Sequence, residues 1–162
     1  MLKLLRFLTC ALLCIGCVMN SRGQENGLKR ADAQLLALRN ATQQGTIGQV
    51  EIIRIPAEVL TRTRVTPEML EKQYHYKLTI REIENYRMKS KLFDAVGSLS
   101  LGPTERTGDL RWGIIFYKKD GTRLCAIYAD AGGSVGSVDL DGVSLKGDLI
   151  SWLRSTLAKC LD

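Results

Sequence analysis

The chain has 162 residues, of which 45% are apolar and 25% charged, and 23 Lys and Arg against 17 Asp and Glu give a formal net charge of +6. This balance is typical of one soluble globular domain, and it excludes a polytopic membrane protein and a largely disordered chain. The positive excess is modest and aromatic residues make up 6%, so we expect an acidic protein or an anionic lipid surface as partner rather than a nucleic acid.

The N-terminus carries the pattern of a secretory signal. Lys3 and Arg6 precede 13 uncharged residues, Phe7–Met19, and a polar stretch follows. A basic start before a short apolar run is typical of export signals, and a helix of this length is too short to cross a hydrocarbon core about 30 Å thick. We predict a signal segment at residues 1–19, a polar tether at residues 20–27 and a single extracytoplasmic domain at residues 28–162.

The end of the apolar run, residues 13–17 (LCIGC), resembles the lipobox of bacterial lipoproteins. In that family a Cys that follows a small residue is cut on its N-terminal side and carries lipid, and Gly16 and Cys17 match this pattern. The departure is Cys14, which stands where the family has Leu. The resemblance implies a lipid anchor on Cys17 and therefore a membrane as partner. The alternative is ordinary signal cleavage after Gly23, where small residues again precede the cut.

Two of the five cysteines, Cys125 and Cys160, lie far from the N-terminal segment. A pair of cysteines suits an oxidising compartment. Cys125 falls in a predicted strand, and Cys160 lies on the face of a predicted helix that packs on the same sheet. We therefore predict a disulfide that encloses about 34 residues and stabilises the fold by about 4 kcal/mol. The alternative is two unpaired buried thiols.

Periodicity in the first half of the domain predicts two helices and two strands. Apolar residues recur at helical spacing over residues 28–42, and Gly45 ends that segment. Residues 49–55 form a β-rich run. Thr66–Pro67–Glu68 has a cap, a proline and an acid in the order that begins a helix. Residues 74–80 then alternate, which predicts a strand with one buried and one exposed face.

The second half predicts a helix, two hairpins and a terminal helix. A helical stripe covers residues 82–99. Strands at 110–118 and 122–129 flank a turn that contains Asp120 and Gly121, and strands at 135–140 and 143–145 flank Asp141–Gly142. Asp148 caps a C-terminal helix. These elements predict an α+β fold, an antiparallel β-meander with its helices packed on one face.

One candidate for catalysis is Ser134, because residues 132–136 match the G-x-S-x-G letters of a nucleophile elbow. An elbow needs a helix after the serine and a histidine later in the chain. Here a strand follows, and the one histidine, His75, lies upstream. We therefore expect a glycine-rich loop between strands. The alternative is a small secreted hydrolase that uses Ser134 or acidic residues such as Asp130 and Asp139.

No motif points to a metal or a cofactor, because one histidine without H-E-x-x-H or paired C-x-x-C motifs falls short of a ligand set. Basic residues in the middle of the chain either form a solvated face or gather into a binding patch. The residues of that hypothetical patch are Lys77, Arg81, Arg87, Lys89 and Lys91. The sequence thus favours a non-enzymatic, lipid-anchored binding protein of the cell envelope, of the assembly, inhibitor or immunity type.

Overall fold

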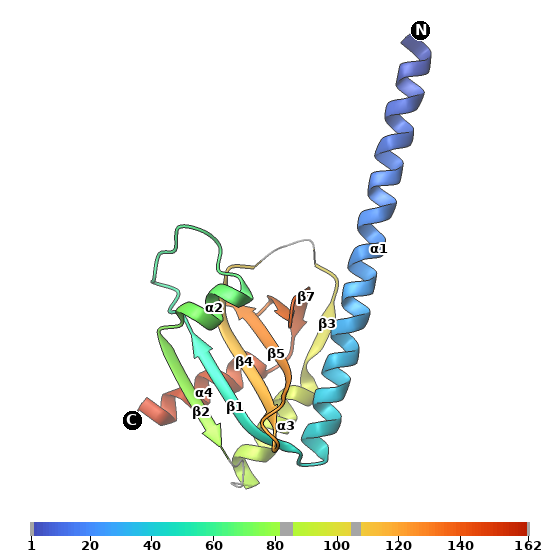
Figure 1. The fold of residues 1–162 in the computed structure, drawn as a ribbon. Coiled ribbons are helices and arrows are strands. Elements are labelled where there is room, and N and C mark those ends of the chain that lie inside the picture. The colour runs from blue at the N-terminus through green and yellow to red at the C-terminus, as the bar shows by residue number, and fades with distance from the viewer. Residues whose placement is uncertain (1, 82–85, 105–107, 162) are drawn as a thin grey trace.

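The computed structural model describes the backbone of residues 2–81, 86–104 and 108–161, and the side chains of residues 23–81, 90–104 and 108–156. Helices and strands alternate along the first part of the chain, and four consecutive strands followed by a helix make up the second part (Figure 1). The elements are α1 (Leu2–Gln43), β1 (Ile47–Arg54), α2 (Pro67–Gln73), β2 (Tyr76–Arg81), α3 (Tyr86–Ser98), β3 (Ser100–Gly102), β4 (Leu110–Lys118), β5 (Arg123–Asp130), β6 (Val135–Val138), β7 (Asp141–Lys146) and α4 (Leu149–Leu161).

The strands form one seven-stranded sheet in the order β2-β1-β4-β5-β6-β7-β3. Every neighbouring pair is antiparallel. This arrangement confirms the α+β class, the C-terminal helix and the meander, which runs from β4 to β7. The three-residue edge strand β3 was not predicted, because Gly102 and Pro103 indicate a break in regular structure and only pairing with β7 makes the segment a strand.

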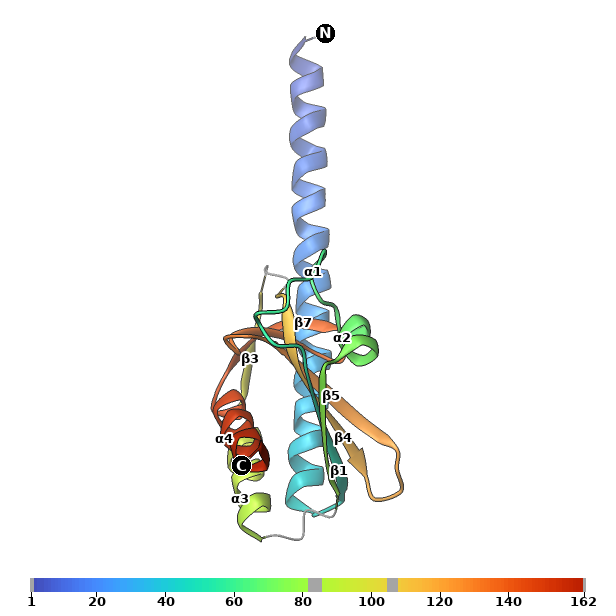
Figure 2. The ribbon, with the colours of Figure 1, turned by 90° about the vertical axis from the view of Figure 1, so that its left-hand side faces the viewer.

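One face of the sheet is covered by α1, α3 and α4, which lie together on the same side of the strands (Figure 2). In α1, Ala31, Leu35 and Leu38 recur at helical spacing and are at most 2% exposed. They pack in one continuous apolar core with strand residues such as Ile114 and Phe116. This face therefore behaves as the protein interior.

The short helix α2 packs on the opposite face, so the prediction that the helices share one face is wrong for α2 (Figure 2). Its buried residue Leu70 belongs to a separate, smaller apolar cluster with Ile53, Ile115 and Tyr128. Periodicity shows which face of a helix is apolar, but it does not show which side of the sheet that helix will cover. The result is a second face that is apolar only near α2.

The helix α1 begins earlier than the sequence predicts. Residues 20–27, for which we predicted a tether, are helical, and Figure 1 shows the N-terminal half of α1 leaving the domain. Among the described side chains of α1, the buried ones start at Ala31. Within the described residues, no helix is long and apolar enough to cross a membrane. Removal of residues 1–19 as a signal stays a prediction.

The second hairpin turns two residues earlier than predicted. Val138 pairs with Asp141, so the turn is Asp139–Leu140 rather than Asp141–Gly142. Asp139 adopts a positive φ of 47°, a conformation that aspartate tolerates better than most residues. Its Oδ1 accepts a hydrogen bond from the backbone N–H of Ala126 at 2.9 Å, which holds the turn against β5. The first hairpin, with β4 and β5 joined near Asp120, is confirmed.

Candidate functional site

A cleft of about 490 Å³ lies between α2, the start of β5 and the turn between β6 and β7. It is on the face of the sheet that α2 covers only in part. The residues that line it are Pro67, Glu68, Glu71, Lys72, Arg123, Tyr128, Asp139 and Leu140. Leu140 at its rim is 75% exposed, whereas Tyr128 at its floor is 1% exposed.

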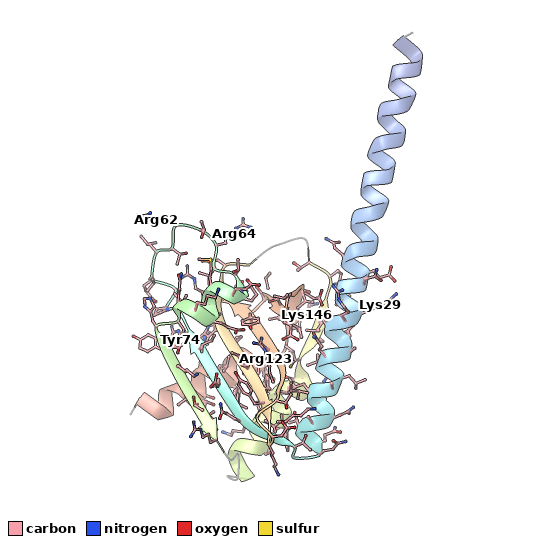
Figure 3. All side chains as sticks on the ribbon, in the orientation of Figure 1. Lys29, Arg62, Arg64, Tyr74, Arg123 and Lys146 are labelled. Atoms are coloured by element: carbon pink, nitrogen blue, oxygen red, sulfur yellow. The ribbon has the colours of Figure 1, made fainter. Side chains whose placement is uncertain are left out.

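Arg123 is the centre of a polar network in this cleft. Its Nη2 lies 3.1 Å from Oε1 of Glu71 and 3.6 Å from Oδ1 of Asp139. Nη2 also donates a hydrogen bond to the hydroxyl of Tyr128 at 2.9 Å, and that hydroxyl in turn donates to Glu71. Figure 3 shows Arg123 over the middle of the strands. The charged groups at the floor of the cleft are therefore already paired with one another.

Within this network, the pKa values of Glu71, Tyr128 and Arg123 are moved away from neutrality. Burial alone would raise the pKa of Glu71, but hydrogen bonds from Tyr128 and Arg123 outweigh it, and the pKa of Glu71 falls below its usual value. Burial, with a contribution from Glu71, raises the pKa of the Tyr128 hydroxyl. Burial opposes the charge of Arg123, but Glu71 and Tyr128 raise the pKa of its guanidinium above the ordinary value. At neutral pH these three groups are one carboxylate, one neutral phenol and one cation.

Asp139 connects the cleft to the helix-covered face. Its Oδ1 accepts from Ala126, and its Oδ2 accepts a hydrogen bond from Nε2 of Gln34 in α1 at 2.5 Å. The neighbouring Asp141 forms an ion pair of 2.6 Å with Arg30, also in α1. Both acids therefore fix the hairpin between β6 and β7 against α1, and neither is free to act as one of a catalytic pair.

Ser134 lies in the loop between β5 and β6, which confirms the prediction of a glycine-rich loop. Its backbone N–H donates to Oδ1 of Asp130 at 2.9 Å, and so does that of Gly133 at 2.6 Å. A strand follows Ser134 where a nucleophile elbow has a helix. His75 precedes β2, and β1, β4 and β5 separate β2 from β6. At about 4.8 Å per strand, β2 and β6 lie roughly 19 Å apart across the sheet, so Ser134 and His75 at their starts are not within hydrogen-bond reach.

The same residues give no ligand set for a metal. Asp130 is occupied by backbone N–H groups, and Asp141 is occupied by Arg30. Among the residues that the structure describes, no three His, Cys, Asp or Glu side chains converge. A cation site built from carboxylates needs more oxygen ligands than any one position here supplies.

Lys77, one residue of the hypothetical basic patch, is paired with an acid. Its Nζ lies 2.9 Å from Oε1 of Glu51, and the hydrogen bond to Glu51 raises the pKa of the ammonium group. This pair lies on the α2 face, whereas α3, with the exposed Lys91, packs on the opposite face. Arg81 ends β2 and is exposed. The side chains of Arg87 and Lys89 lie outside the described residues.

Of Cys17, Cys125 and Cys160, only Cys125 has a side chain among the described residues. Cys125 is buried with a free thiol on the helix-covered face. Burial, together with the charge of Asp139, raises the pKa of this thiol to about 12, so it is a poor nucleophile. The free thiol of Cys125 does not agree with the predicted disulfide to Cys160, whose side chain, like that of Cys17, lies outside the described residues. The mass of the non-reduced chain tests for the disulfide, because a bridged chain is two hydrogens lighter.

Sequence reasoning missed the cleft because its parts are far apart in the chain. Glu71 lies 52 residues before Arg123 and 57 before Tyr128. The apolar run in β5 predicts that Tyr128 is buried, but nothing local indicates that α2 will place a carboxylate next to it. No protein-family model, curated protein or solved structure matches this chain.

Proposed function

We propose that this chain is a non-enzymatic, extracytoplasmic protein of the bacterial envelope, anchored by a lipid on Cys17, that binds another macromolecule at the cleft beside α2. The observation that carries the binding role is the Glu71–Tyr128–Arg123 network at the floor of the cleft. Its groups are paired with one another and their pKa values are moved away from neutrality. General acid–base catalysis works best with a pKa near the working pH, so this network favours recognition over catalysis.

The walls of the cleft indicate the chemistry of the partner. Leu140 offers an apolar contact at the rim, with Glu68 and Lys72 of α2 beside the same opening. A rigid polar floor with an apolar rim suits a protruding segment of a protein that carries an apolar residue next to charges of both signs. The partner class is therefore a protein rather than a small apolar ligand.

Two features support the anchor. Residues 13–17 resemble a lipobox, and the buried side chains described in α1 begin only at Ala31. Cleavage before Cys17 would thus remove none of the described core. A lipid on Cys17 would hold the domain through the part of α1 that leaves the domain (Figure 1), so the cleft would stay open to a partner.

The binding role is tested by a pair of Leu→Asp variants. Leu140→Asp places a charge at the rim of the cleft, and the matched control Leu36→Asp makes the same change at a 57% exposed site on α1. Both variants should keep the fold, because both side chains are largely in solvent. We expect Leu140→Asp to lose the partner that wild type captures by cross-linking in envelope membranes, whereas Leu36→Asp retains it. Equal capture by the two variants would place binding elsewhere.

The anchor is tested separately by Cys17→Ser, with Cys14→Ser as its control. Cys17→Ser should abolish palmitate labelling and move the protein from the membrane fraction to the soluble fraction, and Cys14→Ser should do neither. Labelling that persists in Cys17→Ser refutes the lipid anchor. A mature N-terminus that begins after Gly23 would establish ordinary signal cleavage in its place.

A further inference from the structure

A loop between β1 and α2 projects from the end of the domain where α1 leaves it (Figures 1 and 2). Leu60 on this loop is 96% exposed, the highest value among the exposed large apolar side chains described. Arg62 and Arg64 follow it and are also exposed, and Figure 3 shows both near the outermost part of the loop. We call residues 60–64 the tip. It combines one apolar side chain with two arginines.

The tip stands on a fixed base. Nη1 of Arg111 donates hydrogen bonds to the carbonyl oxygens of Pro56 at 3.2 Å and Val59 at 2.9 Å. On the other side of the tip, the N–H of Val65 donates to Oδ1 of Asp109 at 2.9 Å. Arg111 and Asp109 are themselves joined by an ion pair of 2.5 Å. One half-buried ion pair, between Arg111 and Asp109, thus holds both ends of the loop.

This base separates the apolar residues of the loop into two groups. Val65 is 1% exposed and packs with Leu70 and Leu110 under α2, and Val59 is partly buried against the same cluster. Leu60, next to Val59, points into solvent although an apolar cluster lies beside it. Because the backbone on each side of the tip is fixed, the exposure of Leu60 is built into the loop.

We propose that the tip contacts an anionic lipid surface, with Leu60 entering the boundary between headgroups and acyl chains and Arg62 and Arg64 binding lipid phosphates. Apolar side chains flanked by cations are the pattern of interfacial membrane contacts. Each basic residue close to an anionic surface strengthens binding about fivefold. Arg also binds phosphate with two donors at once, which favours it over Lys in this role. Glu58 is the one acid between Pro56 and Val65, and the charge of Arg64 also acts on Asp109 at the base of the loop.

The position of the tip fits the proposed lipid anchor on Cys17. The inference rests on that anchor in one respect only, namely that this end of the domain faces the membrane. The described part of α1 meets the sheet near Gly27, which lies against Asp141. From there to Cys17 a helix spans about 15 Å. A lipid at Cys17 would therefore hold the end of the domain that carries the tip close to the bilayer.

The opposite end of the domain supplies a control. The turn between β4 and β5 carries exposed Lys118 and Lys119, so it has two cations as the tip does. It lies at the far end of the molecule from the point where α1 leaves (Figures 1 and 2). Loss of either basic pair lowers the net charge equally, and only loss of the tip pair should affect lipid contact.

The test places a benzophenone amino acid at position 60 of the full Cys17→Ser chain and irradiates it with vesicles that contain phosphatidylglycerol. The matched probe is at position 140, which is also an exposed leucine. We expect a phospholipid adduct from position 60 and little from position 140. Arg62→Gln with Arg64→Gln should reduce the adduct roughly 25-fold, from about fivefold per cation. Lys118→Gln with Lys119→Gln should leave it unchanged.

Three outcomes overturn the proposal. They are no lipid adduct at position 60, equal adducts at positions 60 and 140, and, for the same probe in intact cells, an adduct with a protein instead of lipid. Because the assay uses Cys17→Ser and added vesicles, it does not depend on lipidation. Failure of the anchor is seen instead as absent palmitate labelling of the wild type, so the two proposals fail separately.

Discussion

The two faces of the sheet are built differently, and Phe116 and Tyr117 show the difference at adjacent positions of β4. Phe116 points into the core under α1, α3 and α4 and is fully buried. Tyr117 points to the other face, packs at the edge of the cluster under α2 and donates a hydrogen bond to Glu51 at 3.3 Å. One face is a continuous apolar core, and the other combines a small apolar cluster with ion pairs.

This difference separates stability from recognition. Burial of apolar area is the main favourable term in folding, and the helix-covered face supplies most of it. The α2 face contributes less apolar burial, so polar groups such as Arg123 and Glu71 can be placed there without breaking the core. The cleft and the base of the tip both lie on this second face, as expected if it is the face that meets partners.

The largest expected effect is on the helix-covered face. Phe116→Ala should lower the free energy of unfolding by about 4 kcal/mol, because it removes a buried ring and leaves a cavity. Tyr117→Ala, its neighbour, should lower it by only about 1–2 kcal/mol, because that ring is partly exposed. Urea unfolding followed by circular dichroism measures both. Equal losses would mean that the two faces contribute equally to stability.

The next effect concerns the ion pair at the base of the tip. Asp109→Asn keeps an acceptor for Val65 but leaves the guanidinium of Arg111, whose side chain is 9% exposed, without its carboxylate. We expect a loss of about 2 kcal/mol in the free energy of unfolding. This loss of stability is smaller than that usually caused by breaking a buried ion pair, because Asp109 is 41% exposed and Arg111 keeps two carbonyl acceptors.

The double variant Asp109→Asn with Arg111→Met should recover part of that loss, since it removes the unpaired buried charge. It should also free the tip, which faster backbone hydrogen exchange at Leu60 would report. If the double variant were less stable than Asp109→Asn, the contacts of Arg111 with the carbonyls of Pro56 and Val59 would be the more important ones.

Much of the fold could be predicted from the sequence, because its signals are local. The hydrophobic spacing of residues 28–42 and the Thr66–Pro67 helix start both match the structure. The predictions failed where distant contacts decide. Pairing with β7 makes β3 a strand, and the hydrogen bond from Ala126 to Asp139 moves the second hairpin by two residues. In both cases the deciding contact is with a residue distant in sequence, which the local pattern of apolar residues cannot indicate.

The candidate site was harder to predict than the fold. The sequence suggested Ser134 and a basic patch that includes Lys77 as candidate sites. In the structure Ser134 lies in a loop whose backbone binds Asp130, and Lys77 forms an ion pair with Glu51. The cleft depends on α2 crossing to the second face, which brings Glu71 to Tyr128. No pattern within α2 specifies that face, since an apolar residue such as Leu70 would be buried on either side.

A smaller effect is expected in the cleft network. Glu71→Gln should lower the free energy of unfolding by about 1 kcal/mol at pH 7, since a neutral amide replaces the charged acceptor of Arg123 and Tyr128. The pKa of Glu71 is depressed in the folded state, so its contribution is present above the unfolded pKa of about 4.3 and is lost as the pH falls through the folded pKa. The difference between wild type and Glu71→Gln should therefore shrink below about pH 4.

A second measurement follows the tyrosine in the same variant. Glu71 helps to raise the pKa of Tyr128, after burial, so Glu71→Gln should lower that pKa. Ultraviolet difference titration of the phenol measures the shift, with Tyr117 as an internal reference that has Glu51 as its acid. An unchanged titration of Tyr128 would mean that burial alone sets its pKa.

The smallest effect tests how α2 is held on the second face. The hydroxyl oxygen of Thr66 accepts a hydrogen bond from the N–H of Met69 at 3.3 Å, which caps a helix of seven residues. A helix this short does not persist alone, and Leu70 is its one fully buried residue among those described, so the cap should contribute noticeably to its position. Thr66→Ala should lower the free energy of unfolding by about 1 kcal/mol, and Thr66→Ser should have almost no effect. Hydrogen exchange should become faster in α2 in the alanine variant and stay the same in α1, because the two helices pack on opposite faces. If exchange rose equally in both helices, the two faces would open together as one unit, and the separation of stability from recognition would not hold.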